Sequence, residues 1–203
     1  FPLLLRALAS QGKLARLLLV GLVTAGSFAW ALAKQTSTDG FAFYMLPPRA
    51  WELMAGALLA LGAVPQVRAG WLREGLAALG IALIAGSIAL YTKSTVFPGL
   101  AAPPPVLGAA LLIHCAPGTL VGRLLAMPLL VGIGLISYSL YLWHWPLLVF
   151  AEYARDAKLS GLWTLAYCAA AVLAGWASWK WIEAPFRDNR RFDQARVFRW
   201  SAA

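Results

Sequence analysis

The stretch LARLLLVGLVTAGSFAWALA, residues 14–33, decides the fold class of this chain. It carries a single charged side chain, Arg16, and a helix needs roughly 20 mostly apolar residues to cross a bilayer. The rest of the 203 residues shares this bias, because 61% are hydrophobic and 12% are charged. A soluble domain carries about 25% charged residues. We therefore exclude a soluble globular enzyme and predict an all-α polytopic membrane protein.

Further apolar runs divide the chain into about six full transmembrane helices and one partial helix. Residues 1–9 are apolar but too short to cross a bilayer, so we expect them to be the second half of a helix. The run at 106–116 is also short, is flanked by prolines and is expected to extend backward into the preceding loop. The six full spans are predicted at residues 14–33, 47–64, 72–91, 106–116, 128–150 and 161–181.

Lysine and arginine residues are unevenly distributed between the two sides of these spans. The net charge of +9 does not indicate nucleic-acid binding, because the cations lie in short gaps between apolar runs. If the carboxy-terminal tail is cytoplasmic, twelve of the seventeen cations fall on the cytoplasmic side, which fixes the predicted orientation. The twelve are Arg6, Lys13, Arg16, Arg68, Arg73, Arg123, Lys180, Arg187, Arg190, Arg191, Arg196 and Arg199, and the opposite side holds Lys34, Arg49, Lys93, Arg155 and Lys158.

The segment FYMLPPRAWELMAG, residues 43–56, places two charges at the predicted start of a span. Arg49 and Glu52 are three residues apart and share one face of a helix that begins at Pro48. One interpretation is an interfacial ion pair that caps the helix, with Trp51 as an aromatic anchor in the membrane interface. The other is an acidic group with a positioning arginine, facing a cavity that opens to the outer side. The sequence leaves both open.

The segment ISYSLYLWHWPLL, residues 136–148, carries a polar stripe on an apolar helix. Ser137, Tyr141 and His144 fall at i, i+4 and i+7. Because Pro146 has no N–H, the helix is expected to kink beside His144. The stripe predicts a buried polar pocket, and the alternative is an aromatic belt in which His144 hydrogen-bonds a neighbouring helix.

Two other segments carry weaker signals. The proline-rich run STVFPGLAAPPP, residues 94–105, is either the wall of a substrate entrance or a spacer. In WKWIEAPFRDNRR, residues 179–191, Glu183 is expected to pair with one of the nearby cations. Cys115 and Cys168 are expected to be small buried hydrophobes. No Ser/His/Asp set, metal-ligand cluster or phosphate loop can be assembled, so no metal site is predicted.

Several of these strings together resemble the second half of the acyltransferase-3 family, whose members are bacterial polytopic O-acyltransferases. The resemblance rests on FYMLPPRAWELMAGALLAL, TVFPGLAAPPPVLGAALLI, ISYSLYLWHWPLL and WKWIEAPFR, in that order along the chain. It implies that residues 1–186 are part of a multi-pass acyltransferase domain, corresponding to about helices four to ten of ten. Residues 187–203 would be a basic cytoplasmic tail that can lead into a further helix.

The family resemblance implies an activity. Its members transfer an acyl group, usually acetyl, from acyl-CoA to a hydroxyl of a cell-surface polysaccharide, a lipopolysaccharide or a lipid-linked sugar in the bacterial inner membrane. The expected partners are therefore membrane lipid, the glycan acceptor, the donor acetyl-CoA and the amino-terminal half of the domain, with no bound cofactor. The family's catalytic histidine lies on its first helix and has no counterpart in this chain.

The resemblance also assigns roles to residues of this sequence. Arg49, Glu52 and His144 are expected to line or support the cavity, with the catalytic residue itself unknown. Substrate contacts are expected from Phe97, Pro98, Ser137 and Tyr141. A transporter or flippase of lipid-linked sugars, or a non-catalytic membrane subunit, is the alternative function, although no internal repeat is visible.

Overall fold

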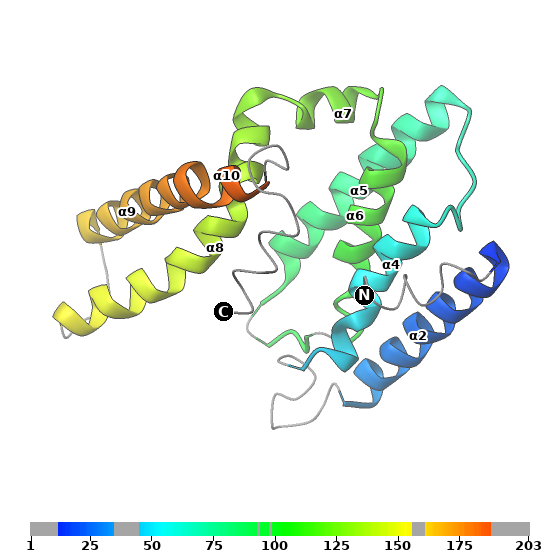
Figure 1. Cartoon of the computed structure of the whole chain (residues 1–203), viewed down its shortest axis with the longest axis horizontal. Coiled ribbons are helices and arrows are strands. Elements are labelled where there is room, and N and C mark those ends of the chain that lie inside the picture. Colours follow the sequence, from blue (N-terminus) through cyan, green and yellow to red (C-terminus); the bar gives the residue numbers. More distant parts are fainter. Residues whose placement is uncertain (1–11, 35–44, 93, 98, 156–160, 188–203) are drawn as a thin grey trace. The chain divides into compact units, whose positions relative to one another are not determined.

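The computed structural model describes residues 12–34, 45–92, 94–97, 99–155 and 161–187 (Figure 1). Within these ranges every regular element is a helix. The predicted partial helix at 1–9 and the tail after Arg187 lie outside the described residues. The chain divides into two compact units, residues 1–124 and residues 125–203, and each is described by itself.

Four of the described helices are long and apolar enough to cross a membrane. This confirms the predicted all-α membrane protein and four of the six predicted full spans. Many of their large apolar side chains are exposed, as expected where a helix faces lipid. The four are Lys13–Lys34, Gly70–Leu90, Pro128–Ala154 and Leu162–Arg187.

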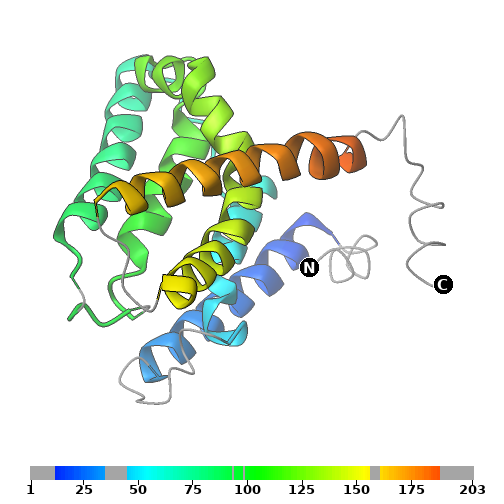
Figure 2. The ribbon, with the colours of Figure 1, turned by 90° about the vertical axis from the view of Figure 1, so that its left-hand side faces the viewer.

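Helices α2, α4, α5 and α6 make up most of the first unit. Helix α2 packs on α4, α4 packs on α6, and α6 packs on α5 (Figures 1 and 2). Because the starts of α4 and α6 lie together and so do their ends, these two helices run in the same direction. The elements are α2 (Lys13–Lys34), the 3₁₀ turn η1 (Pro47–Arg49), α4 (Ala50–Ala60), α5 (Gly70–Leu90), α6 (Pro103–Cys115) and α7 (Leu120–Leu125).

Helix α4 is shorter than the span predicted at 47–64 and covers 11 residues. It ends because Gly62 takes a left-handed conformation with φ of 72°. The N–H of Gly62 then donates to the Leu59 carbonyl, and the N–H of Ala63 donates to the Leu58 carbonyl. This pair of bonds is the Schellman motif, which satisfies the last carbonyls of a helix and turns the chain away.

Helix α6 begins at Pro103, so the predicted backward extension of the run at 106–116 is confirmed. Prolines fit there because the first N–H groups of a helix have no partner. Even so, α6 has only 13 residues, fewer than the roughly 20 of a full span. It packs closely on α5: a Cβ built on Gly80 would lie 2.9 Å from the Gly108 carbonyl oxygen.

The second unit is a helix pair formed by α8 and α9 (Figure 2). Helix α8 continues on both sides of Pro146, and the kink expected beside His144 stays a prediction. The two helices approach each other closely at Gly175, where a Cβ would lie 3.0 Å from the Leu140 Cα. The elements are α8 (Pro128–Arg155), α9 (Leu162–Ser178), the π-helical turn η2 (Trp179–Glu183) and α10 (Ala184–Arg187).

The carboxylate of Glu183 joins α8 to the end of the second unit. Its Oε2 accepts a hydrogen bond from the Ser139 hydroxyl at 3.0 Å, and its Oε1 lies 3.2 Å from Arg187 Nη1. The prediction that Glu183 pairs with a nearby cation is confirmed. Ser139 is fully buried, so Glu183 satisfies a hydroxyl that has no access to solvent.

Candidate functional site

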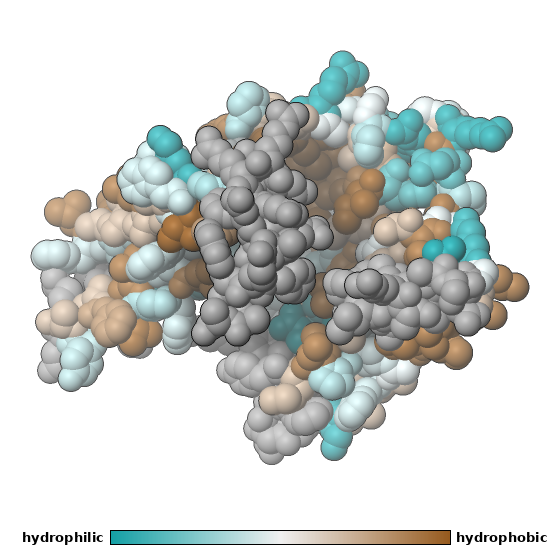
Figure 3. All heavy atoms as spheres, viewed as in Figure 1, coloured by the Kyte–Doolittle hydropathy of each residue, from teal (hydrophilic) through white to brown (hydrophobic). Residues whose placement is uncertain are grey.

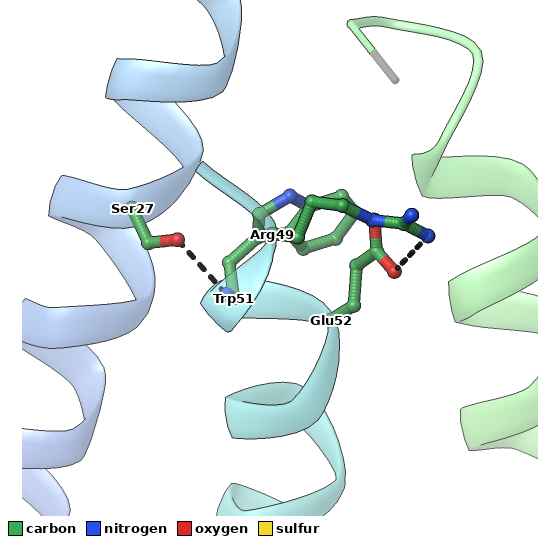
Figure 4. Close-up of polar contacts among 4 residues, drawn as sticks. All are labelled: Ser27, Arg49, Trp51 and Glu52. Carbon is green, nitrogen blue, oxygen red and sulfur yellow. Dashed lines mark hydrogen bonds and ion pairs between the residues drawn. The ribbon is translucent and has the colours of Figure 1, made fainter. Parts of the chain in front are cut away.

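Arg49 and Glu52 form a bidentate ion pair at the start of α4 (Figure 4). Arg49 Nη2 lies 3.2 Å from Glu52 Oε2, and Arg49 Nε lies 3.3 Å from Oε1. The predicted common face is therefore confirmed. The two side chains are 36% and 21% exposed, so the pair is half-buried and each charge is screened less than at an open surface.

The position of this pair is fixed by Ser27, which belongs to α2. The Ser27 hydroxyl donates to the Pro47 carbonyl at 2.5 Å and accepts the backbone N–H of Trp51 at 3.0 Å (Figure 4). The Trp51 N–H lies in the first turn of α4, where a helix leaves its donors without internal partners. Ser27 thus caps α4 from a neighbouring helix and holds the segment that carries Arg49 and Glu52.

Trp51 is a core residue. Its side chain is 7% exposed, and its ring meets Phe28 edge to face with 4.8 Å between centroids. It shares a cluster with Ala31 of α2 and Ala102, which precedes α6. The interpretation of Trp51 as an interfacial anchor is wrong, because two neighbouring segments cover the indole. Among the described residues, the indole N–H finds no hydrogen-bond acceptor.

Glu52 contributes the charged group of a cavity of about 310 Å³ between α4 and α6. Phe97 lies in the same wall, so the structure brings together two of the predicted site residues. The Tyr91 hydroxyl donates to the Ala101 carbonyl at 2.5 Å, which ties the segment before α6 to the end of α5. Pro98 lies outside the described residues. The other lining residues are Ala55, Gly56, Ala102, Pro105, Val106, Ala109, Ala110 and Ile113.

The Phe97 segment is therefore a wall of this cavity. That observation favours the entrance-wall interpretation of residues 94–105 over a spacer. Phe97 also packs on the cluster that holds Trp51, so its aromatic ring is placed by contacts with the core. Whether it contacts a substrate stays a prediction.

In the second unit, Ser137, Tyr141 and His144 line a cavity of about 440 Å³ together with Tyr167 and Cys168 of α9. The predicted stripe thus faces one cavity, but the prediction of a buried pocket is wrong, because Ser137 and Tyr141 are exposed. Cys168 is exposed there, so its prediction as a buried hydrophobe is wrong, whereas Cys115 is buried as expected. The reason is that no further helix of the described second unit covers the cavity between α8 and α9 in which Cys168 lies.

The polar groups of the stripe bond mainly to their own helix. Ser137 donates to the Gly134 carbonyl at 2.7 Å, and His144 Nδ1–H donates to the Tyr141 carbonyl at 2.6 Å. The neutral imidazole then keeps Nε2 as an acceptor. The hydrogen bond that links this part of α8 to α9 uses a backbone group of α8: the Tyr167 hydroxyl donates to the His144 carbonyl at 2.7 Å.

Comparison with known proteins identifies the family. A family model described as an acyltransferase domain matches residues 1–180. The chain belongs to the acyltransferase-3 family. A relative named "Putative membrane-bound transacylase BcsY", from Komagataeibacter xylinus, is 34% identical over 147 residues. That match covers 72% of this chain and 37% of the relative, so the chain spans a little over a third of the relative's length. No solved structure matches this acyltransferase-family chain.

Sequence reasoning on this family member missed several polar residues that the structure places in a helix cap or at a cavity. Ser27 could have been noticed as a hydroxyl in the middle of an apolar span. Arg73 and His114 line a second cavity near the other end of α4. In the sequence, Arg73 was used only as one of the cations that predict the membrane orientation. Among the described residues, no three His, Cys, Asp or Glu side chains lie close enough together to hold a metal ion.

Proposed function

We propose that this acyltransferase-3 chain serves the transfer of an acyl group, usually acetyl, from acyl-CoA to a hydroxyl of a cell-surface or lipid-linked glycan. The observation that carries the proposal is the Arg49–Glu52 pair beside the cavity that Glu52 and Phe97 line. Family membership and the name of the relative support the acyl-transfer chemistry. We further propose a location in the bacterial inner membrane with the tail in the cytoplasm, supported by the arginine and lysine distribution.

The reaction needs an oriented hydroxyl and a base. The acceptor oxygen attacks the thioester carbonyl carbon, a C–O bond forms and the C–S bond breaks. The hydroxyl proton goes to the base, and the CoA thiolate leaves and is protonated. A carboxylate has about four acceptor sites. Glu52 bonded to Arg49 therefore has acceptor sites left for the substrate hydroxyl, and its role is to orient that hydroxyl.

The base is proposed to be a histidine supplied by the amino-terminal part of the family domain. His144 is a weaker candidate for direct contact, because its Nδ1–H is held by its own helix. We expect the 203-residue chain expressed alone to transfer no acyl group. Acetyl-CoA turnover above that of a Glu52→Gln/His144→Ala double variant would contradict this expectation.

The test uses the full-length protein, as its gene encodes it, in proteoliposomes with [¹⁴C]acetyl-CoA and lipid-linked sugars extracted from the source membranes. Glu52→Gln should abolish label transfer while insertion and thermal stability persist, and Glu152→Gln is the matched carboxylate control on α8. Arg49→Met with Glu52→Leu removes both charges and any cost of an unpaired charge. Wild-type transfer by that double variant would refute a functional role for the pair and leave only helix capping.

A further inference from the structure

A second cavity of the first unit lies where α4 and α6 end and α5 begins. Its volume is about 300 Å³. It adjoins the cavity that contains Glu52, because Gly56 of α4 and Ile113 of α6 line both. Its wall combines polar and apolar side chains. The other lining residues are Leu59, Ala60, Gln66, Arg73, His114 and Pro117.

The polar side of this cavity carries a positive charge that no carboxylate of the described residues neutralises. The Arg73 guanidinium donates to the Pro117 carbonyl, and His114 Nε2–H donates to the Pro65 carbonyl at 3.0 Å. Both acceptors are neutral backbone groups. Because a guanidinium has five N–H groups, Arg73 keeps donors for a ligand beside this bond. The polar side can therefore bind an anion.

The carboxylate closest to Arg73 in the chain has another role. Glu74 follows Arg73 on α5, and its two carboxylate oxygens lie 2.8 Å and 3.0 Å from the Leu120 backbone N, whose N–H donates to them. The carboxylate therefore caps α7. Among the described residues, the ion pairs are Arg49–Glu52 and Arg187–Glu183, and neither involves Glu74 or Arg73.

More cations surround the cavity at this end of the first unit. A Cβ built on Gly62 would lie 3.3 Å from Lys13 Nζ, so the start of α2 reaches the end of α4. Figure 3 shows hydrophilic residues gathered over the first unit at the start of α5 and at α7. Glu74 is the one carboxylate here among the described residues, and the net charge is positive. The further cations are Lys13, Arg16, Arg68 and Arg123.

Trp71 indicates the depth of the cavity in the membrane. It stands at the start of the apolar span Gly70–Leu90, and unlike Trp51 it is 79% exposed. Exposed tryptophans at the ends of membrane helices concentrate at the level of the lipid headgroups. Arg73 is two residues further along α5, which is about 3 Å at 1.5 Å per residue. Its guanidinium thus starts from the headgroup level.

The apolar side of the cavity opens toward hydrocarbon. Ile113 of α6 is 66% exposed, as expected for a large apolar side chain that faces lipid. Gly56 lies four residues before Ala60 on α4, so the apolar wall extends about 6 Å inward from the end of that helix. The cavity therefore has a cationic part at the interface and an apolar part beneath it. A phospholipid has a phosphate and acyl chains in the same order.

We propose that this cavity binds an anionic phospholipid, with the headgroup phosphate at Arg73 and an acyl chain along Ile113. Basic pockets between membrane helices bind such headgroups. A zwitterionic lipid is disfavoured because its ammonium would lie among the cations. A water-soluble phosphate compound is disfavoured because it would leave the apolar wall uncovered. The inference goes beyond the proposed function and does not depend on it, since the lipid is not a reactant.

The first experiment counts the lipids that the full-length protein retains when it is released from nanodiscs into a mass spectrometer. In nanodiscs with equal parts of phosphatidylglycerol and phosphatidylcholine, the wild-type protein should retain phosphatidylglycerol in preference. Arg73→Gln should weaken this binding at least about tenfold, since a hydrogen bond between charged groups is lost. Equal retention of the two lipids, or no weakening in Arg73→Gln, would overturn the proposal.

A matched control separates a specific site from general attraction to a basic surface. Arg68 lies at the same end, is exposed and does not line the cavity. Arg68→Gln should therefore keep most of the affinity for phosphatidylglycerol. A loss as large as that of Arg73→Gln would show that only the surface charge attracts the lipid, and the proposed site would be wrong.

The second experiment fills the cavity and leaves every charge in place. Ala60 lines the cavity and is exposed, so Ala60→Trp can occupy the space without entering the core. It should reduce the retention of phosphatidylglycerol at an unchanged thermal midpoint in lipid-free detergent. Ala89→Trp, at an exposed position near the other end of α5, is the control. Wild-type retention by Ala60→Trp would overturn the proposal.

Competition identifies the source of the phosphate. Neither inorganic phosphate nor CoA should displace phosphatidylglycerol from the wild-type protein. Displacement by either would show that the cavity takes a water-soluble phosphate compound, and the lipid proposal would be wrong. These measurements need no acyl acceptor. A protein that binds the lipid in this Arg73-dependent way and transfers no acyl group would keep the lipid site and refute the proposed function alone.

Discussion

The two polar regions of this molecule differ in what their side chains bond to. At the start of α4, the Ser27 hydroxyl of α2 bonds to two backbone groups that lie 20 and 24 positions away in the chain. On α8, Ser137 and His144 bond to carbonyls three positions back in their own helix. Both regions show a comparable pattern in the sequence, polar residues at helical spacing. The second helix reaches the second region only through the backbone, where the Tyr167 hydroxyl of α9 donates to the His144 carbonyl, and it leaves the Ser137 and His144 side chains bonded within α8.

This difference matters for function because a group that orients a substrate must itself be held in place. Glu52 is held by Arg49 at its carboxylate and by Ser27 through the backbone of its helix. His144 is held by its own helix and faces a wide cavity with α9. We therefore expect the first region to be the more sensitive to mutation.

The largest expected effect separates the two regions by activity. Glu52→Gln should lower acyl transfer by the full-length protein about a hundredfold, the scale at which a misplaced reacting group slows catalysis. His144→Gln should lower it less than about tenfold, the scale of one neutral hydrogen bond. Initial rates with [¹⁴C]acetyl-CoA, normalised to membrane abundance, measure both. The reverse order would make His144 the more important group and break the comparison.

The next largest effect is expected on stability, when glycines at close helix–helix contacts are replaced by alanine. Gly108→Ala places a Cβ 2.7 Å from the Gly80 carbonyl oxygen and should cost about 1–3 kcal/mol of stability. Gly175→Ala, with its nearest contact at 3.0 Å, should cost less. Gly134→Ala meets no atom within 4 Å and should stabilise α8 by about 0.5–1 kcal/mol. Thermal unfolding in detergent measures all three, and equal values would show that the helices shift to relieve the contacts.

A smaller loss of stability is expected when the cap that Ser27 provides for α4 is removed. Ser27→Ala removes both bonds of the hydroxyl and should destabilise the protein by about 0.5–2 kcal/mol, as for other helix caps. Ser137→Ala should change stability by no more than about 0.5 kcal/mol, since Ser137 is exposed and bonds within its own helix. The measurement is the thermal midpoint of each variant in the same detergent. A larger loss for Ser137→Ala would show that α8 depends on its stripe.

The smallest effect is expected at the end of the second unit. Arg187→Gln removes the ion pair to Glu183, but the Arg187 side chain is 65% exposed. An exposed pair of this kind contributes about 0–1 kcal/mol. The change in thermal midpoint should shrink further as salt is raised, because salt screens exposed charges. A loss that is large and independent of salt would contradict the assignment of this pair as exposed.

Several features of the fold were predictable because they depend on local patterns. The four long spans follow from runs of apolar residues, and the start of α6 follows from prolines that fit the first turn. The Arg49–Glu52 contact follows from a spacing of three on a helix. The length of α4 was missed, since the left-handed turn at Gly62 is one of several conformations that glycine allows.

The glycines show why other features were not predictable. Gly80 and Gly86 lie in the same helix and look alike in the sequence, yet only Gly80 faces a helix within contact distance. Trp51 was open to interpretation as an interfacial anchor, because tryptophan occurs at the membrane interface and in cores. The structure buries it between α2 and the segment before α6.

The sequence by itself determined the class of the protein, its long membrane helices, the local ion pair and, through motif resemblance, its family. These depend on composition and on residues within one or two helical turns, where spacing fixes geometry. The tertiary structure alone decided that Ser27 caps α4, that Phe97 lies in the same cavity wall as Glu52, and that Gly56 and Ile113 line two cavities. Those contacts join residues far apart in the chain, and only the packing of α2, α4 and α6 brings them together.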